Sequence, residues 1–133
     1  MSDEAQGKEP LRLTTLVDRF AVVRFLPSAT LPEFEDGSFF SFTRTEEEVS
    51  VICREENAGA GGDIEGGWRC LKVGGPLPFT MTGVLASIAV PLAHAAIPIF
   101  VVSTYDTDYV FMKDEKLDGA RTVLAAAGFV VDG

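Results

Sequence analysis

The sequence has few of the residues on which most catalytic and metal sites depend. It holds one histidine and two cysteines in 133 residues. His94 is the sole histidine, so no nucleophile–base pair can be built around an imidazole. No Cys/His cluster has zinc spacing, and no glycine run matches a P-loop or a dinucleotide-binding turn. Asp106 and Asp108 lie at a turn, where solvated carboxylates are commoner than metal ligands. We therefore expect no catalytic residue, no metal and no cofactor.

Positive charge is also scarce. The chain carries 11 basic against 20 acidic side chains, a formal net charge of −9. Nucleic acids and anionic membrane surfaces select basic patches, so neither is an expected partner. Residues 1–10 are polar and acidic without an apolar run, which predicts a disordered tail rather than a signal peptide.

The two cysteines, Cys53 and Cys70, are too few for a disulfide framework. We expect them on strands that flank a common strand, roughly 10 Å apart, whereas a disulfide needs Cα atoms within about 7 Å. The sequence therefore predicts two free thiols and a cytoplasmic protein.

One long segment lacks charge altogether. No charged side chain occurs from Val73 to Tyr105, and residues 83–102 alone are numerous enough to span a bilayer. Against a membrane helix stand Pro91, Pro98, a change from helical to alternating periodicity, and the lack of a flanking Lys/Arg cluster. A buried helix followed by a strand explains the segment better.

That helix–strand pair belongs to a regular series of elements. Residues 77–81 read as a short strand, Thr82 lies where a helix N-cap is expected, and Gly83 allows a tight turn into the helix. The predicted helix has one apolar face, formed by Val84, Leu85, Ile88, Leu92 and Ala95.

The series continues with a hairpin and a second helix. Residues 99–104 and 108–112 are rich in β-branched and aromatic side chains and are separated by a short polar break. A second helical stripe follows, then Gly128 as the helix C-cap and a closing strand at 129–131. The stripe consists of Leu117, Ala120, Leu124 and Ala127.

The first half shows a similar but weaker pattern. Residues 57–67 contain five glycines and read as a flexible loop. Strands are expected at 20–26, 39–43, 49–54 and 68–73, with one more possible at 11–16. We therefore divide the chain into a tail (1–10), a degenerate module (11–75) and a complete β-α-β-β-α-β module (76–133).

Several stretches resemble small bacterial proteins with ACT domains, above all the block from Gly83 to Tyr109 with its run Ser103-Thr104-Tyr105-Asp106-Thr107-Asp108-Tyr109. The resemblance is weaker at three other places: Phe20 to Phe25, Trp68 and Gly75-Pro76-Leu77-Pro78-Phe79. The resemblance implies an α+β, ferredoxin-like fold of two tandem ACT-type modules, the first degenerate. The chain is also remotely similar to eukaryotic arginine sensors. ACT modules generally bind amino acids in a regulatory role and pair with one another, so a small-molecule ligand and a homodimer are implied.

The resemblance also indicates where a ligand would bind. ACT ligands generally touch the first strand–helix turn and a neighbouring strand, here Thr82, Gly83, Val84 and Leu85, with Ser103, Thr104, Thr107 and Asp108. A helix N-terminus attracts a carboxylate through its free N–H groups and its dipole. A carboxylate such as Asp108 can hold an ammonium group.

Each segment also has a plainer interpretation. The turn at Gly83 can be a simple tight turn, and the polar hairpin residues can serve only to fix register. On that view the protein is an interaction or structural module that docks a partner without a ligand.

Overall fold

The computed structural model describes residues 10–33, 37–59, 61–75 and 83–133. The predicted strand at 77–81, Thr82 and all but the last residue of the predicted tail lie outside these ranges. The described elements are β1 (Arg12–Thr15), β2 (Phe20–Phe25), β3 (Ser41–Arg44), β4 (Val49–Arg54), the 3-10 turn η1 (Glu55–Asn57), β5 (Asp63–Val73), α1 (Val84–His94), β6 (Phe100–Ser103), β7 (Asp108–Lys113), the 3-10 turn η2 (Asp114–Lys116), α2 (Leu117–Ala126) and β8 (Val130–Asp132).

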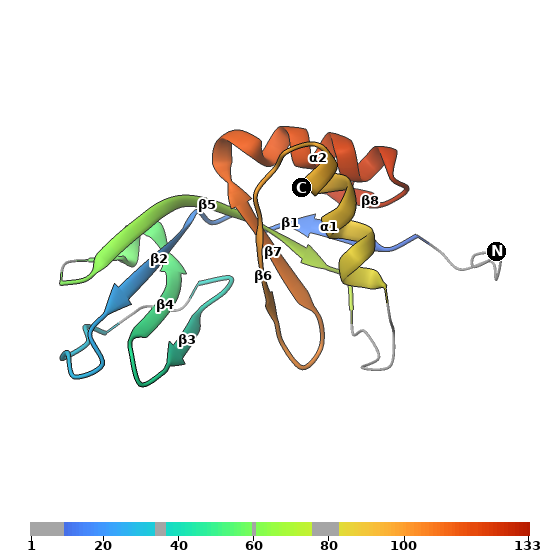
Figure 1. Ribbon diagram of the computed structural model, residues 1–133. Helices are drawn as coiled ribbons and strands as arrows, with labels where there is room; N and C mark the ends of the chain where they lie inside the picture. The colour runs from blue at the N-terminus through green and yellow to red at the C-terminus, as the bar shows by residue number, and fades with distance from the viewer. Residues whose placement is uncertain (1–9, 34–36, 60, 76–82) are drawn as a thin grey trace.

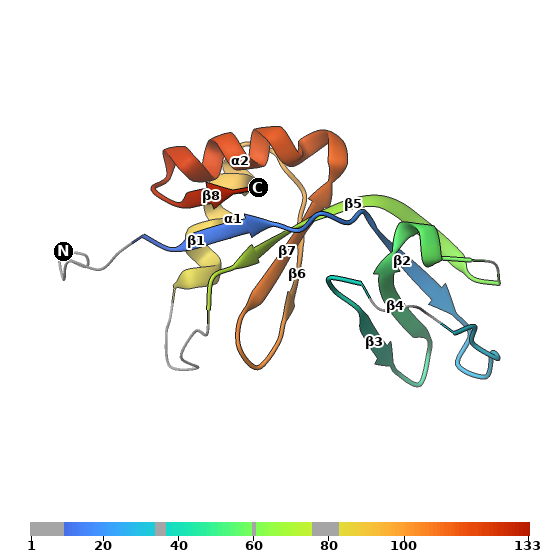
Figure 2. The same ribbon diagram turned by 180° about the vertical axis from the view of Figure 1, so that it is seen from behind.

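The strands form one mixed sheet whose two halves share β5. The first part of β5 pairs with β2, whose other neighbour is β4, followed by β3. The second part pairs with β7 on one side and β1 on the other, and β1 pairs in parallel with β8. Figures 1 and 2 show β5 crossing from one group of strands to the other. We call β2, β3, β4, η1 and the first part of β5 the N-terminal lobe, and the remaining elements the C-terminal lobe.

The C-terminal lobe contains the helix-covered core. Both helices pack on one face of its strands, against Leu13 of β1, Leu71 of β5 and Val110 of β7, all three completely buried. Alternate residues of a strand point to opposite faces, and the other face carries an aromatic cluster. Phe111 stacks on Phe100 at 4.6 Å between ring centroids, and Phe20 of the N-terminal lobe meets Phe111 edge-on at 5.6 Å. The aromatic cluster thus ties the two lobes together.

The N-terminal lobe has a core without an α-helix among its described residues. Ala21, Val23 and Val51 are completely buried on one face of its strands. Leu31 and Ala58, from the connecting segments, pack against the same face. The lobe is the degenerate half of the expected fold: short connections take the place of helices over its sheet.

The predicted glycine-rich loop at 57–67 is wrong over its second part. Residues from Asp63 onward belong to β5, and a β-bulge interrupts the ladder with β2. Gly67 has a φ of 80° there. A bulge of this kind places glycine in the left-handed region, so the glycines that suggested a loop belong to a strand.

Most other predicted elements are confirmed, with small corrections in the helices. Leu85 is 41% exposed and Ala95 is exposed, so neither belongs to the buried face of α1, where Ile88 and Leu92 are completely buried. Ala127 is likewise exposed, just past the end of α2. In each helix the buried stripe therefore ends three residues earlier than its periodicity implies, at Leu92 in α1 and at Leu124 in α2.

The two cysteines lie on strands, and the uncharged segment contains a helix and a strand. Cys53 on β4 and Cys70 on β5 are free thiols on the two strands that flank β2, as expected. In the part of the chain that the structure describes, no helix combines the length and apolar character needed to cross a membrane. The uncharged segment contains α1 and β6 instead.

Candidate functional site

The first candidate segment is the start of α1. The N-cap position is occupied by Gly83 rather than Thr82, with φ of 82° and no side-chain capping hydrogen bond. The carbonyl of Gly83 accepts the Ser87 amide at 2.8 Å, which closes the first turn. A methyl group added at Gly83 would meet no described residue within 4 Å. Among the described residues, none therefore covers the backbone at this turn.

The first turn of α1 carries no acidic side chain. Val84 is half-buried against the helix-covered core, whereas Leu85 is exposed. The Ser87 hydroxyl donates to the Val84 carbonyl at 2.6 Å and so does not reach the first amides. A helix start with neither cap nor carboxylate leaves its positive dipole end uncompensated by the described side chains.

The second candidate segment is the hairpin between β6 and β7, where the polar side chains bond to one another. The Ser103 hydroxyl donates to Asp108 Oδ1 at 2.6 Å. The Thr104 amide and hydroxyl both donate to the Thr107 carbonyl, at 2.8 and 3.1 Å. These bonds fix the register of the hairpin, and they engage one oxygen of the half-buried Asp108.

Thr107 differs from the other three hairpin residues because it points inward. It is 4% exposed, and its hydroxyl donates to the Val73 carbonyl at 2.7 Å. Val73 ends β5, from which the chain continues to α1. Thr107 thus ties the hairpin to the end of β5, and Figure 1 shows the hairpin turn and the start of α1 at the same end of the lobe.

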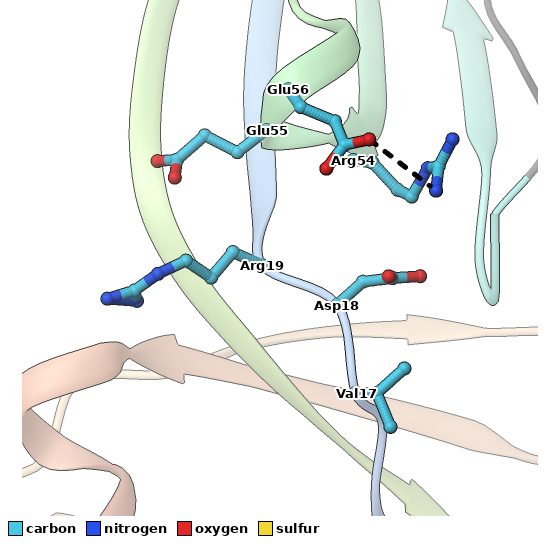
Figure 3. Close-up of a pocket in the computed structure, with 6 residues that line it drawn as sticks. All are labelled: Val17, Asp18, Arg19, Arg54, Glu55 and Glu56. Atoms are coloured by element: carbon cyan, nitrogen blue, oxygen red, sulfur yellow. Dashed lines mark ion pairs between the residues drawn. The ribbon is translucent and has the colours of Figure 1, made fainter.

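A pocket of about 360 Å³ lies elsewhere, at the junction of the two lobes. Its walls come from the β1–β2 connection and from the end of β4 with η1, and Figure 3 shows the Glu55 and Arg19 side chains pointing the same way. No local pattern in the sequence indicates this pocket, because its two walls are separated by more than thirty residues and share no motif. Its lining residues are Val17, Asp18, Arg19, Arg54, Glu55 and Glu56.

The charged groups of this pocket are held by hydrogen bonds and ion pairs to their neighbours. Asp18 accepts the hydroxyl and the amide of Ser38, at 2.7 and 3.1 Å, and these bonds lower the pKa of the Asp18 carboxyl. Arg54 lies 3.7 Å from Glu56, and Arg19 lies 3.0 Å from Asp114. The lining therefore holds three carboxylates and two guanidinium groups, and one of these guanidinium groups pairs with Asp114 outside the lining.

The cysteines are poorly suited to chemistry. Burial raises the pKa of the Cys70 thiol to about 12, and burial also raises the pKa of Cys53. Thiolates are the reactive form, and burial disfavours the thiolate in both side chains. Across the described ranges, no group of three or more His, Cys, Asp or Glu side chains is placed to hold a metal ion.

Comparisons with known proteins agree with the fold. A family model described as an ACT domain matches residues 63–126, and a second, described as an N-terminal domain, matches residues 18–60. The human protein named cytosolic arginine sensor for mTORC1 subunit 1 is 28% identical over 129 residues, covering 86% of this chain and 38% of that protein. The chain thus spans less than half the length of this curated relative.

Solved structures extend the comparison. The regulated enzyme aspartate kinase from Clostridium acetobutylicum matches 86% of this chain and 33% of its own, with a TM-score of 0.65 at 11% identity, which shows likeness of fold alone. Protein Atu0741 from Agrobacterium tumefaciens is 32% identical, covers 93% of both chains and superposes with a TM-score of 0.84. With a matching ACT-domain model and a ferredoxin-like sheet, the chain belongs to the ACT-domain proteins, in one family with Atu0741.

Proposed function

We propose that the protein is a non-catalytic, cytoplasmic regulatory module that binds an amino acid or a closely related metabolite at the start of α1 and the β6–β7 hairpin. The observation that carries the proposal is the open helix start at Gly83, which has no side-chain cap and no acidic residue in its first turn. Backbone N–H groups there are suited to a ligand carboxylate.

The hairpin supplies the complementary charge. Asp108 is half-buried and held by Ser103, so its carboxylate is fixed in orientation before any ligand arrives. An oriented, partly desolvated carboxylate favours an ammonium or guanidinium group. Together with Thr82, Val84, Leu85, Thr104 and Thr107, these residues form the proposed site, with Thr107 acting through the anchoring of the hairpin.

Arginine is the first ligand to test, because the curated relative is named as an arginine sensor. Thermal unfolding would be followed against arginine and a panel of other amino acids at millimolar concentration. A ligand at 100 times its dissociation constant adds about 2.7 kcal/mol, which corresponds to a rise in Tm of about 8–15 °C for a domain of this size.

Two variants separate the parts of the proposed site. Gly83→Asp places bulk and negative charge at the helix start and is expected to abolish binding. Asp108→Ala is expected to weaken a cationic ligand, whereas Asp106→Ala, on the exposed turn of the same hairpin, is the matched control. A flat panel, or full binding by the Gly83→Asp variant, would contradict the proposal and favour a module that docks a partner without a ligand.

A homodimer is part of the same proposal. α1 contains no Asp, Glu, Lys or Arg, yet Val90 is 51% exposed and Ala86 and Ala93 are also exposed. A helix that is apolar all round is normally covered. We propose that a second copy covers it, since two chains of charge −9 repel one another least through an uncharged face.

A further inference from the structure

The point where β5 passes between the lobes is a break in its ladder. Phe20 pairs with Trp68, but Val22 pairs with Glu65, so β5 advances by one residue more than β2. The extra residue falls at Gly66–Gly67, and Gly67 has a left-handed φ of 80°. A bulge leaves backbone groups outside the ladder and bends the strand. At Gly66–Gly67, β5 therefore lacks regular pairing with β2, and other contacts have to hold its backbone.

A carboxylate from the N-terminal lobe holds one side of this bulge. The Gly67 amide donates to Glu55 Oε2 at 2.7 Å. Glu55 begins η1 directly after β4, and its own amide donates to the Arg19 carbonyl at 2.8 Å. A methyl group at Gly66 would collide with the same Glu55 carboxylate. Gly66 thus leaves the space in which the carboxylate sits.

An ammonium group from the C-terminal lobe holds the other side. Lys113, the last residue of β7, donates to the Gly66 carbonyl at 2.6 Å and to the Glu65 carboxylate at 2.5 Å. Its Nζ also lies 4.8 Å from the centroid of the Trp68 ring. Hydrogen bonds with a charged partner are roughly twice as strong as neutral ones.

The Glu55 and Lys113 contacts are linked to each other through a network of ion pairs and hydrogen bonds. Asp114, which follows Lys113, lies 3.0 Å from the guanidinium of Arg19 and 3.3 Å from that of Arg69. The Arg19 carbonyl in turn receives the Glu55 amide. The network therefore connects Glu55, the bulge, the end of β7 and the residue before β2.

We propose that the Gly66–Gly67 bulge is the joint between the two lobes, and that Glu55 and Lys113 are positioning residues that lock its angle. Each residue comes from a different lobe, and both bond to the same peptide group, the one that joins Gly66 to Gly67, in the one strand that the lobes share. When either contact is lost, the Gly67 amide or the Gly66 carbonyl has to bond to water instead, and the two lobes can adopt a wider range of orientations.

Hydrogen exchange by NMR and small-angle X-ray scattering of the full chain test this joint. Glu55→Ala is expected to speed exchange of the Gly67 amide about tenfold or more, because the amide loses its charged acceptor. Gly66→Ala is expected to do the same by displacing the carboxylate, and Lys113→Met to broaden the scattering-derived size distribution. Val110 in the core should keep its protection in every variant, which reports that the fold is intact.

Glu56→Ala is the matched control. Glu56 is the next residue, has a carboxylate that is 74% exposed, and pairs with Arg54 rather than with the bulge. Unchanged exchange at Gly67 in both Glu55→Ala and Gly66→Ala, with Val110 still protected, would overturn the proposal. Equal effects of Glu55→Ala and Glu56→Ala would also overturn it, since they would indicate general loss of surface charge.

Discussion

At the scale of single residues, the end of α1 contains a conformation that alanine rarely adopts. Ala96 has a φ of 59°, and the amides of Ala96 and Ile97 return to the carbonyls of Ala93 and Leu92 at 3.0 Å each. This is the hydrogen-bond pattern of a Schellman motif, in which glycine normally takes the left-handed position. Gly128 occupies that position after α2, with φ of 105°.

Ala96→Gly is therefore expected to stabilise the protein. Left-handed φ costs a residue with a Cβ about 1–2 kcal/mol, part of which is offset by the greater freedom of glycine in the unfolded chain. We expect a net gain of about 0.5–1 kcal/mol, read from urea unfolding. Ala95→Gly is the control: Ala95 has φ of −89°, so glycine there should destabilise. A loss of stability in Ala96→Gly would contradict this account.

Asp18 provides a prediction on pH. Hydrogen bonds from the hydroxyl and amide of Ser38 hold the pKa of the Asp18 carboxyl below its usual value. A lowered folded-state pKa contributes stability above the unfolded-state value, and this contribution is lost as the pH falls through the folded value. Ser38→Ala is expected to raise the pKa of Asp18 and to reduce the acid sensitivity of stability below about pH 4. An NMR titration of Asp18 that is identical in parent and variant would disprove this assignment.

At the scale of elements, one buried hydroxyl links the β6–β7 hairpin to β5. Thr107→Val keeps the shape of the side chain but leaves the Val73 carbonyl without its donor. An unsatisfied buried acceptor costs about 1–3 kcal/mol, so a loss of this size is expected in chemical denaturation. Thr122→Val, on an exposed position of α2, should change stability by less than about 0.5 kcal/mol. Equal losses in the two variants would show that the buried bond is not the cause.

The elements also show what the sequence could and could not predict. α2 was predictable because Leu117, Ala120 and Leu124 recur at helical spacing, and all three are buried. The start of β5 was not predictable, because a Gly-Gly pair has the same sequence pattern in a loop as in a strand with a bulge. Gly66 and Gly67 form such a bulge. Local pattern cannot reveal that Glu55 and Lys113, from distant segments, satisfy the peptide groups of such a bulge.

The proposed site was predictable only in part, for a similar reason. The turn at Gly83 follows from the change of periodicity around one glycine, and no described residue lies within 4 Å of a methyl group placed there. Thr104 and Thr107 look equivalent in sequence, yet Thr107 is buried and Thr104 is exposed. Which hydroxyl faces inward depends on the pairing of the hairpin with β5, which no local pattern records. Ligand contact by these residues stays a prediction.

At the scale of the whole molecule, the uncharged outer face of α1 is the proposed contact between copies. Val90→Glu is expected to abolish dimers at micromolar concentration, because a buried unpaired charge opposes association. Ala125→Glu adds the same charge on the exposed surface of α2 and is the control. Sedimentation velocity would distinguish the two. A parent chain that is monomeric, or a Val90→Glu variant that is still dimeric, would exclude this face as the contact.

The pairing of β1 with β8 has a consequence for how the chain folds. Arg12 and Asp132, which form an ion pair across these strands at 2.7 Å, are 120 residues apart in sequence. Contacts so distant must wait for the chain between them, and long-range pairing slows folding. During synthesis, β1 has to remain without this neighbour until residues 130–132 are available. The C-terminal lobe is thus expected to complete its sheet later than the N-terminal lobe, whose strands all lie earlier in the chain.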